Sequence, residues 1–345
     1  MKLNRKQSLL PGIGACVGML ALILDARTAM AGAAGGVELC VKTVIPSLFP
    51  FFVLSILLTG SLSGRRIGFL EPLGRLCGVP RGAESLLLVG ALGGYPVGAQ
   101  CVAQAYRQGA LGKADAGRML GFCSNAGPAF LFGMGAALFD SVAVPGVLCA
   151  IHLLSALAVG ALLPGKRRSA APVPAGDTIR LPEVVTKSVA VMAGVCGWVV
   201  LFRVLLAFLD RWCLWLLPLT GRTVVYGLLE MTNGFAVLKA ITPEGLRFVL
   251  CSVFLGFGGI CVTMQTSSVT ARCGLGMGYY LPGKLLQTCM SLLLSCAAQV
   301  LLFPASLRWR FPILLPVLAV FAGVLILAVL HRQKKSSSIP EPVGV

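Results

Sequence analysis

The sequence predicts an all-α polytopic membrane protein with about eight spanning helices and two re-entrant helical hairpins in an inverted repeat. Hydrophobic residues make up 57% of the 345 residues and charged residues only 12%, against roughly 25% charged in a soluble domain. The mean hydropathy is +0.89. Several apolar runs approach the roughly 20 residues that a spanning helix needs, so we expect the chain to cross a bilayer many times.

The first span is expected over residues 9–24, behind a basic start that holds the N-terminus in the cytoplasm. This segment resembles a signal peptide, and an Ala-rich stretch at 29–34 offers a cleavage site. Because the rest of the chain is itself polytopic, an uncleaved helix is the simpler interpretation. Further apolar runs cover residues 45–62, 84–106, 118–139, 143–163, 184–209, 222–240, 247–268, 279–303 and 312–331.

The basic residues predict which runs cross the membrane. The 29 Lys and Arg outnumber the 12 Asp and Glu, and cytoplasmic loops retain basic residues. If every run before the basic linker crossed, that linker would lie outside. Run 84–106 contains GGYPVGA, which breaks a helix, so we expect it to return to the cytoplasm. Run 222–240, broken at Asn233-Gly234, is the matching outer element, which leaves eight spans and two cytoplasmic termini.

The expected organisation follows from this count. An N-terminal membrane helix (1–34) precedes a first repeat (35–163), a cytoplasmic basic linker (164–183), a second, inverted repeat (184–331) and a cytoplasmic tail (332–345). The 13 cysteines form no CxxC pair, and no nucleotide-binding, metalloprotease or hydrolase motif occurs. We therefore expect no enzyme, no cofactor, no metal site and no nucleic-acid partner.

The two halves carry similar motifs in the same order. GGYPVGA at 93–99 matches MTNGFAV at 231–237, and residues 118–130 match residues 254–266. A single span separates the two units, so the second unit would lie upside down relative to the first. In inverted-repeat transporters, the substrate site lies where discontinuous helices meet.

The helix breaks supply the candidate site. In SNAGP at 124–128, proline and glycine free backbone carbonyls, which together with Ser and Asn side chains must face protein, water or a ligand. A simple proline kink is the alternative. Arg203 could bind a ligand or extend to the interface, and Glu230 could couple protons or lie at the interface. The expected substrate-binding residues are Gly94, Tyr95, Pro96, Gly98, Gln100, Ser124, Asn125, Gly127, Pro128, Thr232, Asn233, Gly258, Gly259 and Gln265.

The motifs PSLFPFFVLS at 46–55, GGYPVGA and SNAGP, in this order, resemble the sporulation integral membrane proteins of YlbJ type, which belong with the nucleoside-recognition Gate proteins. The resemblance implies a role in spore formation and movement of dipicolinate from mother cell to forespore. The family's Gly-Tyr-Pro turn falls on residues 94–96, and its Asn-Gly-Pro break falls on Asn125, Gly127 and Pro128. Relatives often carry lysine where this chain has Gln100.

The leading functional hypothesis is a secondary transporter or facilitator for a small polar, anionic solute, with dipicolinate implied by the resemblance. Helix N-termini at the breaks can bind carboxylates without a formal charge. The expected partners are this solute and the lipid bilayer; a coupling ion, Na⁺ or H⁺, and a homo-oligomer are left open. The expected location is the bacterial cell membrane, with the forespore membrane as an alternative. A membrane scaffold of sporulation that transports nothing is the second hypothesis.

Overall fold

The regular structure is helical throughout the described part of the chain. The computed structural model describes residues 5–62, 67–141, 143–163, 165 and 180–303, and every regular element in these ranges is a helix. The all-α prediction is confirmed. The predicted run 312–331, the tail 332–345 and most of the linker 164–183 lie outside the described residues. Five described segments are long and apolar enough to span a membrane: Ala26–Leu58, Ala143–Leu162, Leu181–Trp212, Glu244–Ala271 and Tyr280–Leu302.

The N-terminal helices α1 (Arg5–Leu24), α2 (Ala26–Leu39) and α3 (Ile45–Leu62) extend further than the apolar run suggested. A π-helical turn joins α2 to α3, so one long helix begins at Ala26 rather than at residue 45. Its first part is rich in Ala and Gly because it crosses α10 closely. A Cβ added at Gly36 would lie 2.9 Å from the Cα of Val200, and small residues allow such close helix contacts in membranes.

Short helices follow in the first half of the chain. Run 84–106 forms the two helices α5 (Ser85–Leu92) and α6 (Val97–Arg107). Each is about 12–17 Å long at 1.5 Å per residue, so neither crosses a hydrocarbon core of about 30 Å by itself. They form a hairpin whose turn lies at the GGYPVGA motif. The elements are α4 (Glu71–Leu76), α5 (Ser85–Leu92), α6 (Val97–Arg107), α7 (Lys113–Leu120) and α8 (Pro128–Phe130), which a π-helical turn (Leu131–Gly135) and a 3-10 turn (Ala136–Leu138) extend.

The second half has the same order of elements, but its hairpin breaks at a different residue from the one predicted. The hairpin consists of α11 (Leu219–Leu229) and α12 (Met231–Leu238), followed by α13 (Glu244–Phe257) and α14 (Gly259–Ala271). The hairpin breaks at Glu230, whose backbone is extended, and not at Asn233-Gly234 as predicted. Gly234 instead allows α12 to pack closely on α11, since a Cβ at Gly234 would lie 2.4 Å from the Cα of Gly227.

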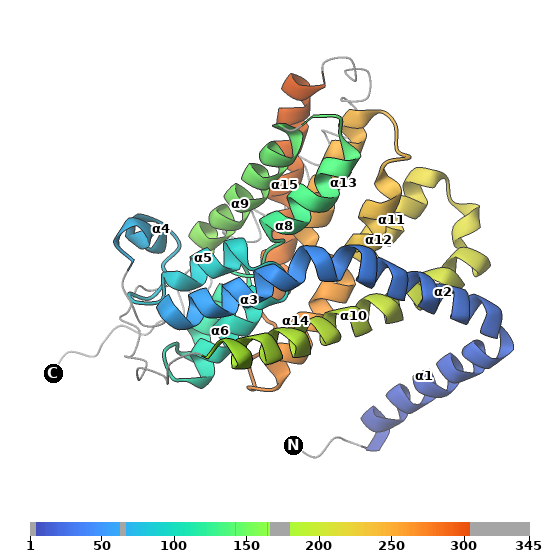
Figure 1. Cartoon of the computed structure of the whole chain (residues 1–345), viewed down its shortest axis with the longest axis horizontal. Helices are drawn as coiled ribbons and strands as arrows, with labels where there is room; N and C mark the ends of the chain where they lie inside the picture. Colours follow the sequence, from blue (N-terminus) through green and yellow to red (C-terminus); the bar gives the residue numbers. More distant parts are fainter. Residues whose placement is uncertain (1–4, 63–66, 142, 164, 166–179, 304–345) are drawn as a thin grey trace, which may run out of the picture.

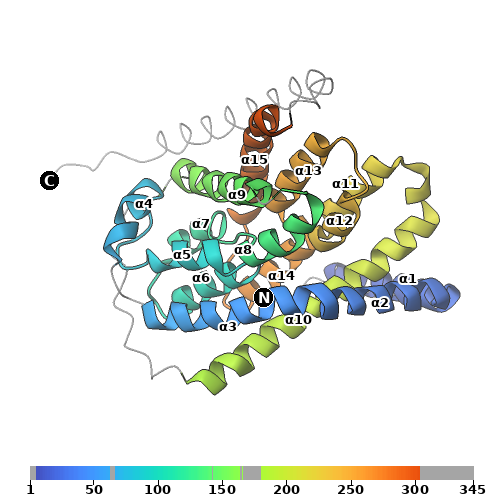
Figure 2. The same ribbon diagram turned by 45° about the horizontal axis from the view of Figure 1, so that its top comes forward.

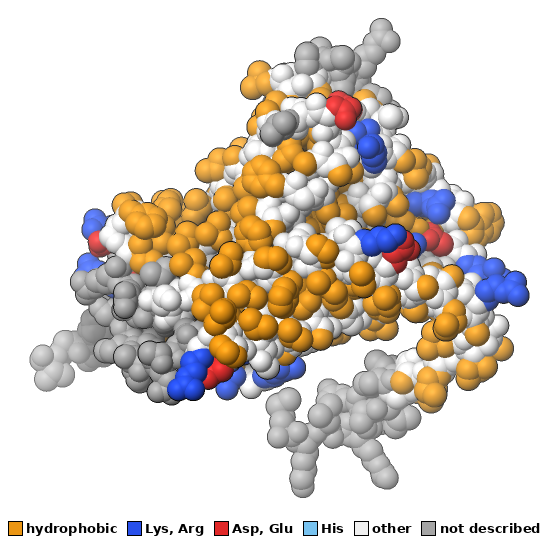
Figure 3. All heavy atoms as spheres, viewed as in Figure 1, with side chains coloured by type: hydrophobic (Ala, Val, Ile, Leu, Met, Phe, Trp, Pro, Cys, Tyr) orange, Lys and Arg blue, Asp and Glu red, His pale blue; other side chains and the backbone are white. Residues whose placement is uncertain are grey.

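Three long helices complete the described bundle: α9 (Ala143–Leu162), α10 (Leu181–Trp212) and α15 (Tyr280–Leu302). Helix α10 crosses α2 and α3, and α15 packs beside α9 and α13 (Figures 1 and 2). Apolar side chains cover most of the face in Figure 3, and Lys, Arg, Asp and Glu side chains gather mainly toward its edges. This arrangement suits a protein surrounded by lipid.

Candidate functional site

The helix breaks of both halves are in contact. A Cβ added at Gly127 would lie 3.1 Å from the Cα of Gly94, and one added at Gly258 would lie 3.1 Å from the ring carbon that bears the Tyr95 hydroxyl. Gly94 and Gly258 have φ values of 73° and 80°, a region that favours glycine. A Cβ added at Gly259 would lie 3.3 Å from both Leu229 O and Met231 N, so the break at Glu230 adjoins the same place.

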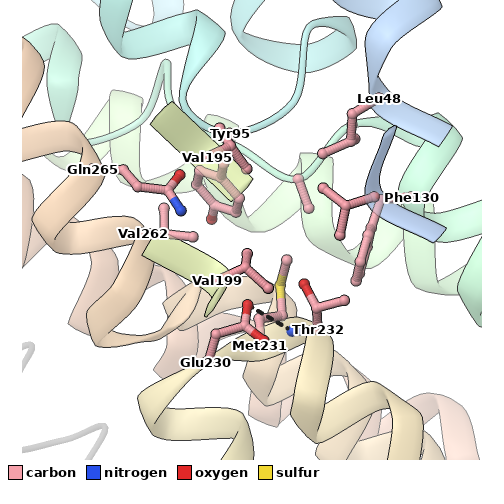
Figure 4. Close-up of a pocket in the computed structure, with 13 residues that line it drawn as sticks. Leu48, Tyr95, Phe130, Val195, Val199, Glu230, Met231, Thr232, Val262 and Gln265 are labelled. Carbon is pink, nitrogen blue, oxygen red and sulfur yellow. Dashed lines mark hydrogen bonds between the residues drawn. The ribbon is translucent and has the colours of Figure 1, made fainter. Parts of the chain in front are cut away.

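A small cavity lies at this point (Figure 4). Its volume is about 30 Å³, enough for one or two water molecules and far below the roughly 300–1,000 Å³ of small-molecule sites. The cavity is therefore too small for an organic solute in this arrangement of the helices. Four of the predicted site residues line it: Tyr95, Gly127, Thr232 and Gln265. The other lining residues are Val44, Leu48, Ala126, Phe130, Val195, Val199, Glu230, Met231 and Val262.

Glu230 places a carboxylate in the wall of this cavity. Its residue exposure is only 2%. One carboxylate oxygen accepts a hydrogen bond from Thr232 N at 3.1 Å, and the other accepts from Asn233 N and Nδ2, both at 2.7 Å. The side chain therefore caps α12 from inside the bundle. From the sequence, Glu230 was expected either to couple protons or to lie at the membrane interface. Its buried position fits an interfacial carboxylate less well.

A second polar cluster lies behind the Tyr95 ring and centres on Lys284, which is fully buried. Its ammonium donates to the Tyr95 hydroxyl at 3.1 Å, to Gln287 Oε1 at 2.7 Å and to the Ser124 carbonyl. The Tyr95 hydroxyl in turn donates to the Leu255 carbonyl at 3.1 Å. Tyr95 therefore belongs to both the cavity wall and the Lys284 cluster.

The extended segment through SNAGP is held by side chains from its surroundings. Asn125 Nδ2 donates to the carbonyls of Phe122 and Gly90 at 2.8 and 3.2 Å, and its Oδ1 accepts from Gln287 Nε2 at 3.0 Å. The backbone N–H of Ala126 donates to His152 Nε2 at 3.0 Å. These bonds satisfy backbone groups that a break inside a membrane would otherwise leave unpaired.

The remaining predicted residues do not line the cavity. Gly98 packs on the carbonyl of Cys123, Asn125 and Asn233 bond as described, and Arg203 packs beside Gly35 and Gly36 of α2. The others stand at the breaks or on the helices beside them: Gly94, Pro96, Gln100, Ser124, Pro128, Gly258 and Gly259. Their role in substrate binding stays a prediction.

Lys284 and Gln287 are not among the site residues predicted from the sequence, because a lysine at the start of an apolar run normally lies at the interface. A signal for the buried position was present. Residues 284, 287, 291 and 295 repeat at helical spacing, and all four carry polar side chains that the structure buries. A polar stripe along a membrane helix faces protein or a cavity rather than lipid.

These features define the class: a multi-pass, all-helical integral membrane protein whose broken helices meet inside the bundle. The chain is similar to the sporulation integral membrane protein YlbJ of Bacillus subtilis (strain 168), with 28% identity over 300 residues that cover 73% of each chain. This similarity confirms the resemblance to the YlbJ-type family. No family model matches the chain, and no solved structure matches it.

Proposed function

We propose that this protein is a secondary transporter or facilitator that moves a small anionic solute across a membrane during spore formation, with dipicolinate as the first candidate. The observation that carries the proposal is the meeting of four helix breaks, two from each half, beside one small cavity. Broken helices that meet inside the membrane are how many secondary transporters build their substrate site.

The packing of the two hairpins supports an inverted repeat with two re-entrant elements. In the first half, Gly90 and Gly98 both pack on Cys123, four residues before the break at Gly127. In the second half, Gly227 packs directly on the ring of Phe254, which likewise precedes its break glycine by four residues. Each hairpin thus uses glycine to pack on the helical turn that leads into a break.

The ends of the corresponding helices support the inversion. Arg118, on α7, donates to the Cys77 carbonyl at 2.6 Å and lies beside Gly165, just after the end of α9. Arg247, on α13, donates to the Leu138 carbonyl at 2.6 Å, just before the start of α9. The two arginines therefore lie at opposite ends of the same 20-residue helix, as two oppositely oriented units require.

The topology can be tested with a native thiol. Cys213 is exposed and lies near the ion pair between Arg211 and Asp25, at the end that the proposal places outside. A membrane-impermeant maleimide is expected to label Cys213 in intact cells, and Cys213→Ser should remove that label. A thiol added by Arg107→Cys in the Cys213→Ser background, at the exposed last residue of α6, should react only after permeabilisation. The reverse pattern would invert the proposed topology.

Transport itself is tested with purified protein in lipid vesicles. We expect vesicles with protein to take up radiolabelled dipicolinate faster than empty vesicles, and uptake to saturate. Nucleosides and simple carboxylates define the solute class. The small volume of the cavity favours the alternative, a scaffold of sporulation that transports nothing; protein-containing vesicles with no uptake of any of these compounds would support that alternative.

A further inference from the structure

We propose that Lys284 and the hydroxyl groups of Ser124, Thr266 and Tyr280 form a binding site for one carboxylate group of the solute, between the two halves of the bundle. The inference rests on the proposed function and names the site that would hold the anion. The evidence comes from an uncompensated buried charge and from a neighbouring group of buried hydroxyls that make no hydrogen bond of standard geometry to a described residue.

The charge of Lys284 has no counter-ion within the described residues. No described carboxylate lies within ion-pair distance, and all three hydrogen-bond acceptors of its ammonium are neutral oxygens, from Tyr95, Ser124 and Gln287. Burial of an unpaired ammonium is strongly unfavourable. A bound carboxylate would supply the missing negative charge by replacing one of these neutral acceptors.

Three buried hydroxyl groups belong to residues around Lys284: Tyr280 lies one turn before it on α15, and Ser124 and Thr266 lie beside the Tyr280 hydroxyl. The side-chain oxygens of these three residues make no hydrogen bond of standard geometry to any described residue. Ser124 is also the residue whose carbonyl accepts from Lys284. Buried hydroxyl groups almost always have a partner, and hydroxyl donors beside an ammonium are what a carboxylate accepts from.

The Lys284 cluster adjoins the cavity through Tyr95. Tyr95 contacts both, since its ring centroid lies 5.0 Å from Lys284 Nζ and its side chain lines the cavity. A solute whose carboxylate meets Lys284 would therefore place its remaining atoms beside Tyr95, in a cavity that has opened. Ser124 comes from the first half, whereas Thr266, Tyr280 and Lys284 come from the second, so movement between the halves would assemble or disrupt the site.

The test compares two solutes of the same shape that differ in charge: pyridine-2,6-dicarboxylate and its neutral diamide. Lys284→Gln keeps hydrogen-bonding capacity and removes the charge. In vesicles, we expect this variant to lower uptake of the dicarboxylate at least tenfold and to leave uptake of the diamide within twofold. The control is Arg203→Gln, which removes a charge from a spanning helix away from the cluster and should leave the ratio of the two solutes unchanged.

A second variant protects the test against misfolding. Ser124→Ala removes one of these buried hydroxyls and should preserve the folded protein, while it reduces the rise in melting temperature that the dicarboxylate produces in detergent solution. If Lys284→Gln and Ser124→Ala both keep the wild-type response to the dicarboxylate, the site does not exist although transport stands. If the wild-type protein neither transports nor is stabilised by either solute, the proposed function fails and the inference fails with it.

Discussion

Gly98→Ala is expected to abolish the folded protein. A Cβ at this position would lie 1.9 Å from the carbonyl oxygen of Cys123, which is about half of a normal carbon–oxygen contact. The clashing atom belongs to the backbone of the extended segment, and Gly90 packs on the same carbonyl from α5. Neither side can move without separating the hairpin from the break. The yield of monodisperse protein in detergent and its melting temperature are the measurements.

Two control variants show whether the loss of folding in Gly98→Ala comes from the clash with the Cys123 backbone. Gly194→Ala, in the middle of α10, has no neighbouring atom within 4 Å of the added Cβ and should be neutral or stabilise by up to about 1 kcal/mol. In Gly227→Ala the three atoms nearest to the added Cβ all belong to the ring of Phe254, the closest at 2.3 Å, so Phe254→Ala should rescue that variant in part. Cys123→Ala should not rescue Gly98→Ala. A wild-type melting temperature for Gly98→Ala would contradict the described hairpin packing.

Asn125→Ala is expected to destabilise the protein by about 2–4 kcal/mol, since each buried hydrogen-bonding group left without a partner costs about 1–3 kcal/mol. The variant loses the bonds to the carbonyls of Gly90 and Phe122 and the bond from Gln287. Reduced flux should accompany this loss, because the same bonds hold the break beside the cavity. The measurements are the melting temperature and uptake per folded protein.

Gln100→Ala is the control for this variant, because Gln100 is an amide side chain that is only half-buried on α6. It should change stability by less than about 0.5 kcal/mol. The sequence predicts Asn125 as a substrate-binding residue, whose loss would impair transport more than folding. If Asn125→Ala keeps the wild-type melting temperature and loses uptake, that prediction holds and Asn125 contacts the solute directly.

The sequence located the breaks with proline or paired glycines well, because these residues cannot continue a helix without cost. It misplaced the break at Asn233-Gly234, since one glycine inside a helix serves close packing as readily as it ends the helix. The beginning of α2 was missed because Ala and Gly contribute little hydropathy. Lys284 was expected at the interface from its place near the start of an apolar run, although the polar residues 284, 287, 291 and 295 share one helix face; the packing of α15 against Ser124 and Tyr95 removes it from the interface.

The hydroxyl of Tyr95 is one of the groups that join the two halves of the bundle, and its two bonds set a lower bound on the free energy that separation would cost. It bonds to the Leu255 carbonyl and to Lys284, so separation at this point breaks two hydrogen bonds. One neutral and one charged bond together contribute about 2–4 kcal/mol. If nothing else opposed separation, roughly one molecule in thirty to one in a thousand would be open at equilibrium. The open form would then be a minor population that a ligand can select, and no external energy source would be needed to reach it.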